Sequence, residues 1–382
     1  MSRRLALITE IIAPYRIPVF NSLAQQPGIG LHVLFLAEND PTQRHWPVYK
    51  DEIQFAYQVL PSWRRRFAGH NLLLNWNVEV ALDRLAPEAI ICGGYNYIAS
   101  WKALRWARLH RVPFLLWAES TLRDLRQKFA AVERIKTKFL RHCDGFIVPG
   151  KSSFEYLGSY GAQSELIFTA PNAVDTDFFA QRSSLIRAGA DLYRKAMNLP
   201  PRFFLFVGRF VREKGVFDLL AAYASLPVDL RGEVGLVFAG TGRARLELET
   251  RAAAIAPGRV QVVGFASRED LAIYYTLADA LVFPTHTDPW GLVVNEAMAC
   301  GLPVICSNVA GCAADLVEDT ENGLIVPVGD SKQLASAMEQ LARDYELRLK
   351  MGLAGRAKIE HYSPQACAAG MAQAVVARCE AA

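Results

Sequence analysis

The sequence predicts an α/β protein with two Rossmann-like domains, each a doubly wound parallel sheet, that face a central cleft. Three observations predict this class. Short apolar runs alternate with amphipathic helical patterns along the 382 residues. These runs alternate little between apolar and polar residues, as strands do when helices cover both sheet faces. Finally, the whole series occurs twice, on either side of a break near residues 171–202.

The predicted strands are the apolar runs rich in Val, Ile, Leu and Phe. In the first half they are Arg4–Glu10, Leu31–Ala37, Phe55–Leu60, Ala89–Cys92, Pro113–Ala118, Gly145–Val148 and Leu166–Thr169. In the second half they are Phe203–Val207, Val234–Ala239, Val260–Val263, Ala280–Phe283, Pro303–Cys306 and Gly323–Val326. Helical patterns lie between them, for example at Val216–Leu226, Arg243–Ile255 and Leu334–Ala342. Because the strands alternate with helices, the sheets are predicted to be parallel.

The break between the two series predicts the domain boundary. Pro171-Asn172 is followed by a polar stretch and then by Pro200-Pro201, which interrupts the periodic pattern. We therefore expect one domain over residues 1–175 and a second over residues 176–360. A length of 382 residues is consistent with two or three domains.

The composition is that of an ordinary globular protein, with 52% hydrophobic and 21% charged residues, which excludes disordered and fibrous classes. No apolar run approaches the ~20 residues that span a bilayer. Glu10 interrupts the apolar stretch near the N-terminus, so a first buried strand is favoured there over a secretory signal. The seven cysteines are scattered without a CxxC pair, which favours reduced core thiols. A cytoplasmic location is the resulting expectation.

The charge is unevenly distributed, although its net value is only +4. Residues 101–141 contain 11 basic and 3 acidic side chains, which indicates an anionic partner. Basic and aromatic residues interleave in Trp63–Phe67 and in Trp101–Trp106. Two interpretations stay open for these segments, a solvated surface or peripheral docking on an anionic membrane. Nucleic acid is not expected, because no binding module is recognisable.

The segment from Phe283 to Cys306 holds the densest group of candidate functional residues. A strand is predicted to end at Phe283 and a helix to begin near Gly291, where free backbone N–H groups suit a phosphate. Asp288 precedes this helix and is interpreted as a sugar contact, with a helix cap as the alternative. Glu296 lies among apolar residues, where a carboxylate needs a partner, and is interpreted as a ribose ligand rather than a surface charge.

A second group follows the first strand of the second half. Gly208 and Gly215 flank Arg209 and Lys214, and the two cations can reach one anion, Arg as a fork and Lys as a point charge. Phosphate binding is favoured here over a solvated helix start.

Two further motifs are ambiguous. Gly240-Thr241-Gly242 precedes a helix, but Arg245 stands where a dinucleotide fingerprint has its third glycine, so NAD binding is disfavoured. Asp175-Thr176-Asp177 has a form that can hold a metal, but a turn or hinge role is favoured because it lies at the domain boundary.

At these motifs the sequence resembles the GT-B-fold retaining glycosyltransferases of family 4 (glycosyl transferases group 1). Four family elements occur in the same order, a PN-G-VD element, a GR…EKG element, a G-x-G turn and an E-x7-E element in which Asp288 replaces the first Glu. The residues that match are Pro171, Asn172, Val174, Asp175, Gly208, Arg209, Glu213, Lys214, Gly215, Gly240, Gly242, Asp288 and Glu296.

The resemblance implies transfer of a sugar from a nucleoside-diphosphate sugar to a glycan or lipid-linked glycan, with retention of the anomeric configuration. It implies that residues 1–175 bind the acceptor, that residues 176–360 bind the donor, and that residues 361–382 cross back to the first domain. Implied catalytic residues are Asp288, Arg209 and Lys214. Glu119 is a further candidate catalytic residue, at a position where many relatives have a histidine. The donor-binding residues that it implies are Gly208, Arg209, Lys214, Gly240, Phe265, His286, Asp288, Trp290, Gly291, Leu292, Val293 and Glu296.

Some roles stay open at this point. Glu119 is either an acceptor-side catalytic group or a buried, paired acid, and His286 is expected to shape the sugar pocket rather than act as a base. No metal and no cofactor are expected, because Arg209, Lys214 and the helix start can neutralise the leaving diphosphate. Two rival functions remain, a nucleotide-sugar epimerase on the same fold and a non-catalytic nucleotide-sugar-binding protein.

Overall fold

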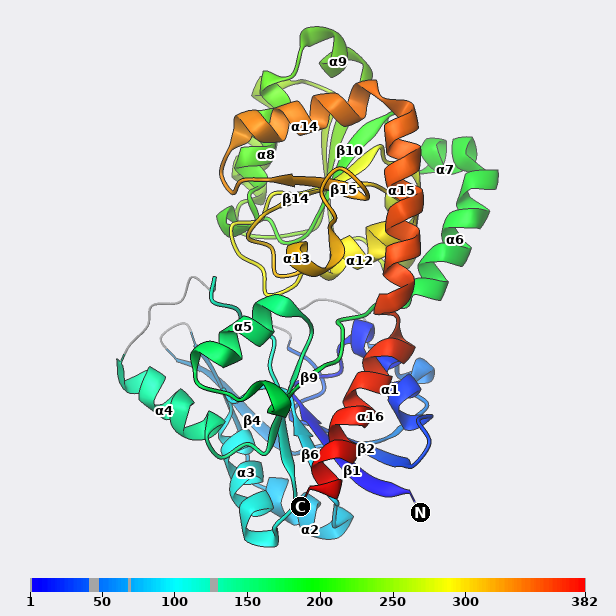
Figure 1. Cartoon of the computed structure of the whole chain (residues 1–382). Coiled ribbons are helices and arrows are strands. Elements are labelled where there is room, and N and C mark those ends of the chain that lie inside the picture. Colours follow the sequence, from blue (N-terminus) through cyan, green and yellow to red (C-terminus); the bar gives the residue numbers. More distant parts are fainter. Residues whose placement is uncertain (1, 41–47, 68–69, 124–129, 382) are drawn as a thin grey trace. The chain divides into compact units, whose positions relative to one another are not determined.

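The computed structural model describes residues 2–40, 48–67, 70–123 and 130–381 and divides into two compact units (Figure 1). Unit 1 holds the chain up to Val174, apart from a short segment after Leu122, together with Ser363–Ala382. Unit 2 runs from Asp175 to Tyr362. The division therefore lies one residue from the predicted boundary, and the C-terminal segment belongs to unit 1. The cysteines are all free thiols.

Unit 1 is built on a seven-stranded parallel sheet. Its strands are β1 (Arg3–Thr9), β2 (Ile29–Phe35), β3 (Ala56–Val59), β6 (Ala89–Cys92), β7 (Phe114–Trp117), β8 (Gly145–Val148) and β9 (Ile167–Thr169). The spatial order is β3-β2-β1-β6-β7-β8-β9, so the direction of winding reverses between β1 and β6. This reversal defines a doubly wound sheet, as the sequence predicts.

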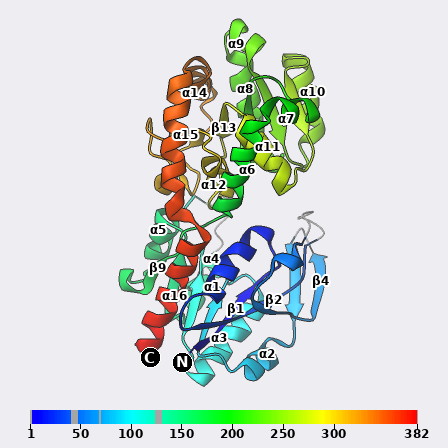
Figure 2. The ribbon, with the colours of Figure 1, turned by 90° about the vertical axis from the view of Figure 1, so that its right-hand side faces the viewer.

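Helices cover both faces of this sheet. One face packs against α2 (Val78–Leu85), α3 (Ile98–His110), α4 (Ala130–Leu140) and α5 (Lys151–Ser159). The other face packs against α1 (Ile17–Ala24) and the C-terminal helix α16 (Pro364–Glu380), which lie side by side (Figure 2). Burial on both faces explains why the strand sequences are almost continuously apolar.

A hairpin in unit 1 is absent from the predicted elements. β4 (Ser62–Phe67) and β5 (His70–Asn75) form a two-stranded antiparallel sheet. The aromatic and basic segment Trp63–Phe67 is therefore a strand. Arg64 forms an ion pair of 2.7 Å with the buried Asp40, so this cation is held by the protein itself.

The second aromatic and basic segment, Trp101–Trp106, is mostly part of the core. Trp106 is only 5% exposed and its indole N–H donates to Asp83 at 2.7 Å. Trp101 packs edge-on against Phe139 with ring centroids 4.8 Å apart. Asp83 and Phe139 thus hold these two indoles in the protein, which favours the interpretation of Trp101–Trp106 as a solvated surface helix with a packed inner side.

Unit 2 is built on a six-stranded parallel sheet. Its strands are β10 (Phe203–Val207), β11 (Gly235–Ala239), β12 (Val260–Val263), β13 (Ala280–Phe283), β14 (Val304–Ser307) and β15 (Gly323–Val326). The spatial order is β12-β11-β10-β13-β14-β15. The winding therefore reverses between β10 and β13, which places the loops after these two strands beside each other at one edge of the sheet.

The helices of unit 2 are α6 (Thr176–Ala188), α7 (Ala190–Ala196), α8 (Val216–Ser225), α9 (Val228–Glu233), α10 (Arg245–Ile255), α11 (Arg268–Leu277), α12 (Leu292–Ala299), α13 (Ala313–Leu316), α14 (Ser331–Arg343) and α15 (Tyr345–Ile359). α8, α10 and α14 bury their apolar faces against the sheet in one core. α12 contacts β13 and β14, and α11 contacts β10.

The predicted fold class, two Rossmann-like domains with parallel sheets, is confirmed. Every predicted strand is present, with ends shifted by no more than two residues. Among the described helices, none is both long and apolar enough to cross a bilayer.

Candidate functional site

The candidate site lies where the winding of the unit 2 sheet reverses. β10 and β13 are neighbours there, and in open parallel sheets ligands bind beyond the carboxyl ends of such strands. The loop after β10 carries Arg209 and Lys214, and the loop after β13 carries His286 and Asp288. The topology thus brings together two groups of candidate residues that lie about eighty positions apart in the sequence.

Close approach of these loops requires glycine. A Cβ atom on Gly215 would lie 2.0 Å from the carbonyl oxygen of Pro284, and one on Gly240 would lie 1.9 Å from that of Gly208. Both glycines have positive φ angles, 70° and 146°, in a region that other residues rarely adopt. Gly240, predicted to bind the donor, therefore packs its own loop against the loop after β10.

A lysine–aspartate pair joins the two loops. The Lys214 ammonium contacts the Asp288 carboxylate at 2.5 Å and donates to the carbonyl of Thr287 at 3.0 Å. The other carboxylate oxygen of Asp288 accepts from the backbone N–H of Trp290 at 3.1 Å. Both side chains are largely buried, 12% exposed for Lys214 and 20% for Asp288. Lys214 and Asp288, which belong to separate motifs of the sequence, thus form one ion pair.

This pair keeps bonding capacity for a ligand. An ammonium group has three donors, and two of those on Lys214 are used. Each oxygen of the Asp288 carboxylate accepts one hydrogen bond and has a second lone pair. The pair can therefore donate to an anion on one side and accept from hydroxyl groups on the other.

Arg209 lies at the same edge of the sheet and is exposed. It has no hydrogen-bond or ion-pair partner within the described part of the chain. Its neighbour Gly208 has a φ angle of 152°. Its exposed guanidinium adds a positive charge beside the Lys214–Asp288 pair, whose own charges largely cancel.

The start of α12 completes the edge. Gly291 is the N-cap of the helix with a φ angle of 105°, and a Cβ there would lie 2.6 Å from the ring of Phe283. Leu292 and Val293 open the helix, and the first N–H groups of a helix lack partners inside it. Asp288 accepts from the Trp290 N–H, which precedes the N-cap Gly291, so its hydrogen bond lies before the helix rather than inside its first turn.

The Trp290 side chain has a structural role. Its indole is 4% exposed and its N–H donates to the buried Asn295 at 2.9 Å. The ring therefore packs inward and fixes the loop onto α12, and the assignment of Trp290 to donor binding stays a prediction. Asn295 has no distinguishing motif, and sequence analysis missed it.

Glu296 lies one turn into α12 and accepts a hydrogen bond of 2.6 Å from the hydroxyl of Tyr275. Burial raises the pKa of the Glu296 carboxyl to about 7, although the Tyr275 hydrogen bond acts in the opposite direction. A buried carboxyl needs a hydrogen-bond partner, and for Glu296 this partner is Tyr275 of α11.

Two further predicted residues lie at the same edge. His286 contacts the carboxylate of Asp218 through Nε2, and its backbone N–H donates to Glu213 at 2.9 Å. Asp218, on α8, was not predicted. Phe265 follows β12 and is 52% exposed, and the preceding Gly264 accepts from the Gly240 backbone at 3.0 Å.

Asp175 serves as the N-cap of α6, because its side chain accepts from the Phe178 N–H at 3.0 Å. This contact accounts for Asp175 without a metal and agrees with the turn role favoured by the sequence.

Glu119 belongs to unit 1 and lies just after β7. Its carboxylate is bound by the guanidinium of Arg16, which also donates to Asn172 at 3.0 Å and stacks over Trp117 at 4.0 Å from the ring centroid. Burial alone would lower the pKa of Arg16, but the adjoining Glu119 carboxylate raises it. The Glu119 side chain is 37% exposed, so this paired acid is still open to solvent.

Two family models match the chain, one mainly over unit 1 and the other within unit 2. Residues 22–178 match the family model Glycosyltransferase Family 4, and residues 192–358 match Glycosyl transferases group 1. The structure of HepE from Anabaena, in complex with UDP and glucose, aligns with a TM-score of 0.75 and 17% identity over 98% of this chain and 99% of that one. The fold is GT-B.

A second solved GT-B structure is similar over its whole length. Sucrose-phosphate synthase from Thermosynechococcus elongatus aligns with a TM-score of 0.74 and 22% identity, covering 100% of both chains. At these identities the likeness shows the GT-B fold alone.

Curated relatives are more similar in sequence but over a shorter stretch. The D-inositol 3-phosphate glycosyltransferase of Thermomonospora curvata is 33% identical over 210 residues, 51% of this chain and 48% of the relative. The capsular polysaccharide biosynthesis glycosyltransferase CapM of Staphylococcus aureus is 33% identical over 170 residues, 44% of each chain. The chain thus spans about half the length of the curated relatives that it matches.

We predict that Glu296→Gln makes the protein more stable than the wild type at pH 8 but not at pH 5. The folded-state pKa of about 7 lies above the ordinary 4.5, so ionising the buried carboxyl costs stability as pH rises from about 4.5 to 7. Glutamine avoids this cost, which is at most about 3 kcal/mol. Melting temperatures of the full chain from pH 5 to 8 measure the difference.

The matched control is Glu346→Gln, at an exposed position on α15. Its melting profile should run parallel to that of the wild type. If the Glu296→Gln profile also runs parallel, Glu296 is not held neutral by burial.

Proposed function

We propose that this protein is a retaining glycosyltransferase that moves a sugar from a nucleoside-diphosphate sugar to a glycan or lipid-linked glycan. The observation that carries the proposal is the Lys214–Asp288 pair at the point where the winding of the unit 2 sheet reverses, beside Arg209 and the start of α12. This edge offers cations and N–H donors for a diphosphate and a carboxylate for sugar hydroxyls. The family models matched by both units support glycosyl transfer.

The diphosphate is assigned to Arg209, Lys214 and the N–H groups of Leu292 and Val293. In the transfer, the bond between the anomeric carbon and the distal phosphate oxygen breaks, and negative charge grows on that oxygen. A fixed ammonium and a helix start stabilise this charge without first having to reorganise. Such groups typically contribute roughly 100- to 1000-fold each to the rate. These cations are sufficient in our proposal, which includes no metal and no cofactor.

The sugar, ribose and base are assigned to three further residues. Asp288 accepts hydrogen bonds from hydroxyls of the transferred sugar, held in place by Lys214 and the Trp290 N–H. Glu296 binds the ribose hydroxyls in either protonation state, since a carboxyl and a carboxylate both accept hydrogen bonds. The exposed ring of Phe265 provides a stacking surface for the base.

Unit 1 is assigned to the acceptor. The Glu119 carboxylate is fixed by Arg16 and is still partly exposed, so it can accept a hydrogen bond from an acceptor hydroxyl. In the proposed reaction that hydroxyl oxygen forms the new bond to the anomeric carbon from the face that the diphosphate leaves. Its proton passes to the departing phosphate oxygen, so atoms and charge balance and the configuration is retained.

Two other functions would use the same donor site. An epimerase would convert a nucleotide sugar without an acceptor, and a binding protein would bind it without turnover. Neither is favoured by a specific contact in the structure, and one assay separates all three.

The first test asks which donor the protein binds and whether turnover requires an acceptor or a metal. A thermal-shift screen of UDP-, GDP- and ADP-sugars should identify a donor, because a ligand that binds only the folded state raises the melting temperature. We expect that donor to be consumed only when an acceptor glycoside is added, also in excess EDTA. NMR of the product should show the anomeric configuration of the donor. Inversion, turnover without acceptor, or activity restored only by Mg²⁺ would each contradict part of the proposal.

We predict that Arg209→Ala and Lys214→Ala each lower turnover by roughly 100-fold or more, because each removes a cation from the leaving group. Arg212→Ala is the matched control, since Arg212 lies between them but is exposed and paired with Glu247. Steady-state kinetics with the identified donor measure all three. Equal activity in the three variants would remove the diphosphate assignment.

We predict that Asp288→Asn lowers kcat by roughly 100-fold while leaving the affinity for the nucleoside diphosphate nearly unchanged. Asparagine keeps the size and can still accept from the Trp290 N–H, but it lacks the charge that Lys214 balances. Kinetics are compared with calorimetric binding of the diphosphate. Full turnover in this variant would show that Asp288 only shapes the turn before α12.

A further inference from the structure

A nearly enclosed arginine lies at the point where the winding of the unit 1 sheet reverses. Arg16 ends the short turn Pro14–Arg16 after β1, and β1 is the neighbour of β6 at this reversal. In open parallel sheets ligands bind beyond the carboxyl ends of such strands. The Arg16 side chain is only 12% exposed, so a ligand has little access to it. Any role of Arg16 in the reaction is therefore exerted through the side chains that it contacts.

The Arg16 guanidinium joins three segments of unit 1. One terminal nitrogen donates to Oε1 of Glu119, after β7, and the other donates at 3.0 Å to Oδ1 of Asn172, after β9. The guanidinium carbon lies over the ring of Trp117, the last residue of β7, at 4.0 Å from the centroid. Trp117 and Asn172 are 4% and 2% exposed. Buried groups thus anchor the guanidinium, and the guanidinium in turn holds Glu119.

The Glu119 carboxylate keeps one oxygen open. Arg16 binds Oε1, whereas Oε2 has no hydrogen-bond partner within the part of the chain that the structure describes. The Glu119 side chain is 37% exposed, about three times as much as that of Arg16. A carboxylate oxygen accepts up to two hydrogen bonds. One oxygen therefore fixes the orientation of the side chain, while the other is available to a hydroxyl group.

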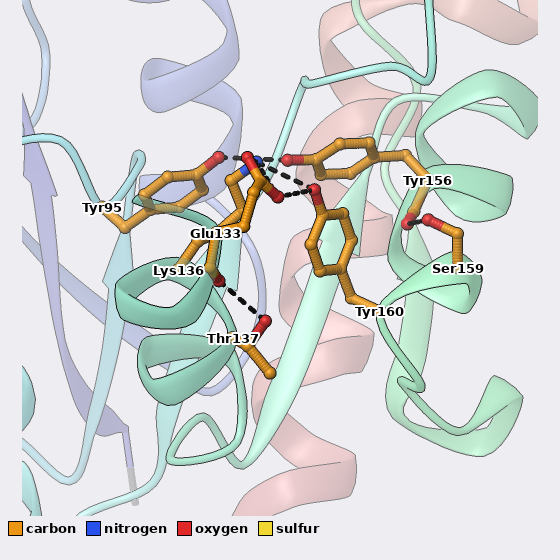
Figure 3. Close-up of polar contacts among 7 residues, drawn as sticks. All are labelled: Tyr95, Glu133, Lys136, Thr137, Tyr156, Ser159 and Tyr160. Carbon is orange, nitrogen blue, oxygen red and sulfur yellow. Dashed lines mark hydrogen bonds and ion pairs between the residues drawn. The ribbon is translucent and has the colours of Figure 1, made fainter. Parts of the chain in front are cut away.

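The loop that carries Glu119 has a second, separate support. Ser120 follows Glu119, and its side chain hydrogen-bonds to the hydroxyl of Tyr95, after β6. The Tyr95 hydroxyl belongs to the cluster of tyrosines around Lys136 of α4 (Figure 3). This cluster holds the backbone after β7 without Arg16. Loss of Arg16 should therefore release the Glu119 side chain rather than the loop.

Stability alone does not account for the Arg16–Glu119 pair. Apolar residues in place of an ion pair inside a protein are often neutral or stabilising, because desolvating two charges is costly. A purely structural pair would also be enclosed on both sides, whereas this pair is open to solvent on the side of the acid. The arrangement resembles a functional carboxylate with a support behind it.

We infer that Arg16 is a positioning residue for the acceptor. It holds Oε1 of Glu119, so that Oε2 accepts the hydrogen bond of the acceptor hydroxyl in one fixed orientation. The acceptor oxygen is thereby placed for its attack on the anomeric carbon. The inference rests on the proposed function, since it concerns the acceptor of that reaction. Lysine can replace Arg16 only in part, because an ammonium is a point charge without the planar fork that reaches both Glu119 and Asn172.

The test is steady-state kinetics of Arg16→Met and Arg16→Lys with the donor identified by thermal shift. The acceptor probes are the p-nitrophenyl glycosides of glucose, galactose, mannose and N-acetylglucosamine. We predict that Arg16→Met lowers kcat/KM for the acceptor by roughly 100-fold, as expected for a reacting group misplaced by about 1 Å, and Arg16→Lys by roughly tenfold. The KM for the donor should stay within about twofold of the wild type in both variants. Wild-type acceptor kinetics in Arg16→Met, or a loss confined to donor KM, would overturn the inference.

A double-mutant cycle tests whether Arg16 acts through Glu119. In the Glu119→Gln background, Arg16→Met should lower kcat/KM for the acceptor by less than about twofold further, because the carboxylate that Arg16 orients is already absent. Effects of the two substitutions that multiply would show that Arg16 acts independently of Glu119, which contradicts the inference.

The matched control is Arg108→Met, which breaks an ion pair at the opposite end of the same strand. Arg108 pairs with Asp144 at 3.4 Å, and Asp144 accepts from the N–H of Phe114, the first residue of β7. This variant should keep wild-type kinetics. An equal loss in Arg108→Met would indicate a general effect on unit 1 and would exclude a specific role of Arg16.

The outcomes separate the inference from the proposed function. Circular dichroism and the thermal shift caused by the donor verify that each variant is folded and binds the donor. If the wild type transfers sugar and the Arg16 variants do so equally well, the inference alone fails. If the wild type transfers none, the proposed function fails and the inference fails with it.

Discussion

The approach of backbone to backbone beyond the carboxyl ends of β10, β11 and β13 is the constraint on which the candidate site depends. The winding of the sheet reverses there, so three loops converge, and glycines remove the side chains that would separate them. Gly242 shows the same constraint, since a Cβ on it would lie 2.3 Å from the carbonyl oxygen of Phe210. The convergence places Lys214 against Asp288, and this ion pair in turn fixes the turn that starts α12.

The Lys214–Asp288 pair resolves an electrostatic conflict within the site. A carboxylate near the transferred sugar would repel the diphosphate if it were alone, whereas a lone buried ammonium would be costly to desolvate. Pairing them makes the local charge close to neutral and leaves Arg209 and the start of α12 as the net positive elements. Sugar hydroxyls and phosphate oxygens can then be bound within one small region.

The sequence predicts the strands well because both sheets are buried on both faces. Such strands are short apolar runs that end where glycine, proline or polar residues begin, and β6, β8 and β13 have the predicted bounds. The β4–β5 hairpin escapes prediction because β4 is basic and aromatic, β5 is a run of only three leucines between polar residues, and both lie outside the main sheets. The local sequence pattern therefore predicts strands that are buried on both faces better than strands that lie outside the main sheets.

The site could be predicted only in part, and the reason is distance along the chain. Lys214 and Asp288 are identified by type and by local motif, but their contact depends on the order of the strands. The Arg16–Glu119 pair joins residues that share no motif, so the sequence leaves the state of Glu119 open. The inward packing of Trp290 could not be predicted either, because an aromatic residue beside a glycine at a helix start has the same pattern whether it faces a ligand or packs inward.

The basic segment of residues 101–141 shows why charge counts need a structure. The surplus of cations is visible in the sequence, but their availability is decided by partners that lie elsewhere, such as Glu79 and Asp144 for α3. On α4 the acidic residue, Glu133, is turned inward by Tyr160 and Lys136, and this contact leaves the exposed cations of the helix unbalanced. Phe139 and Leu140 of α4 are buried on the same side as this contact, so apolar packing and the polar network together orient the helix. The contacts on the inner side of a helix therefore decide which of its charges stay available to solvent.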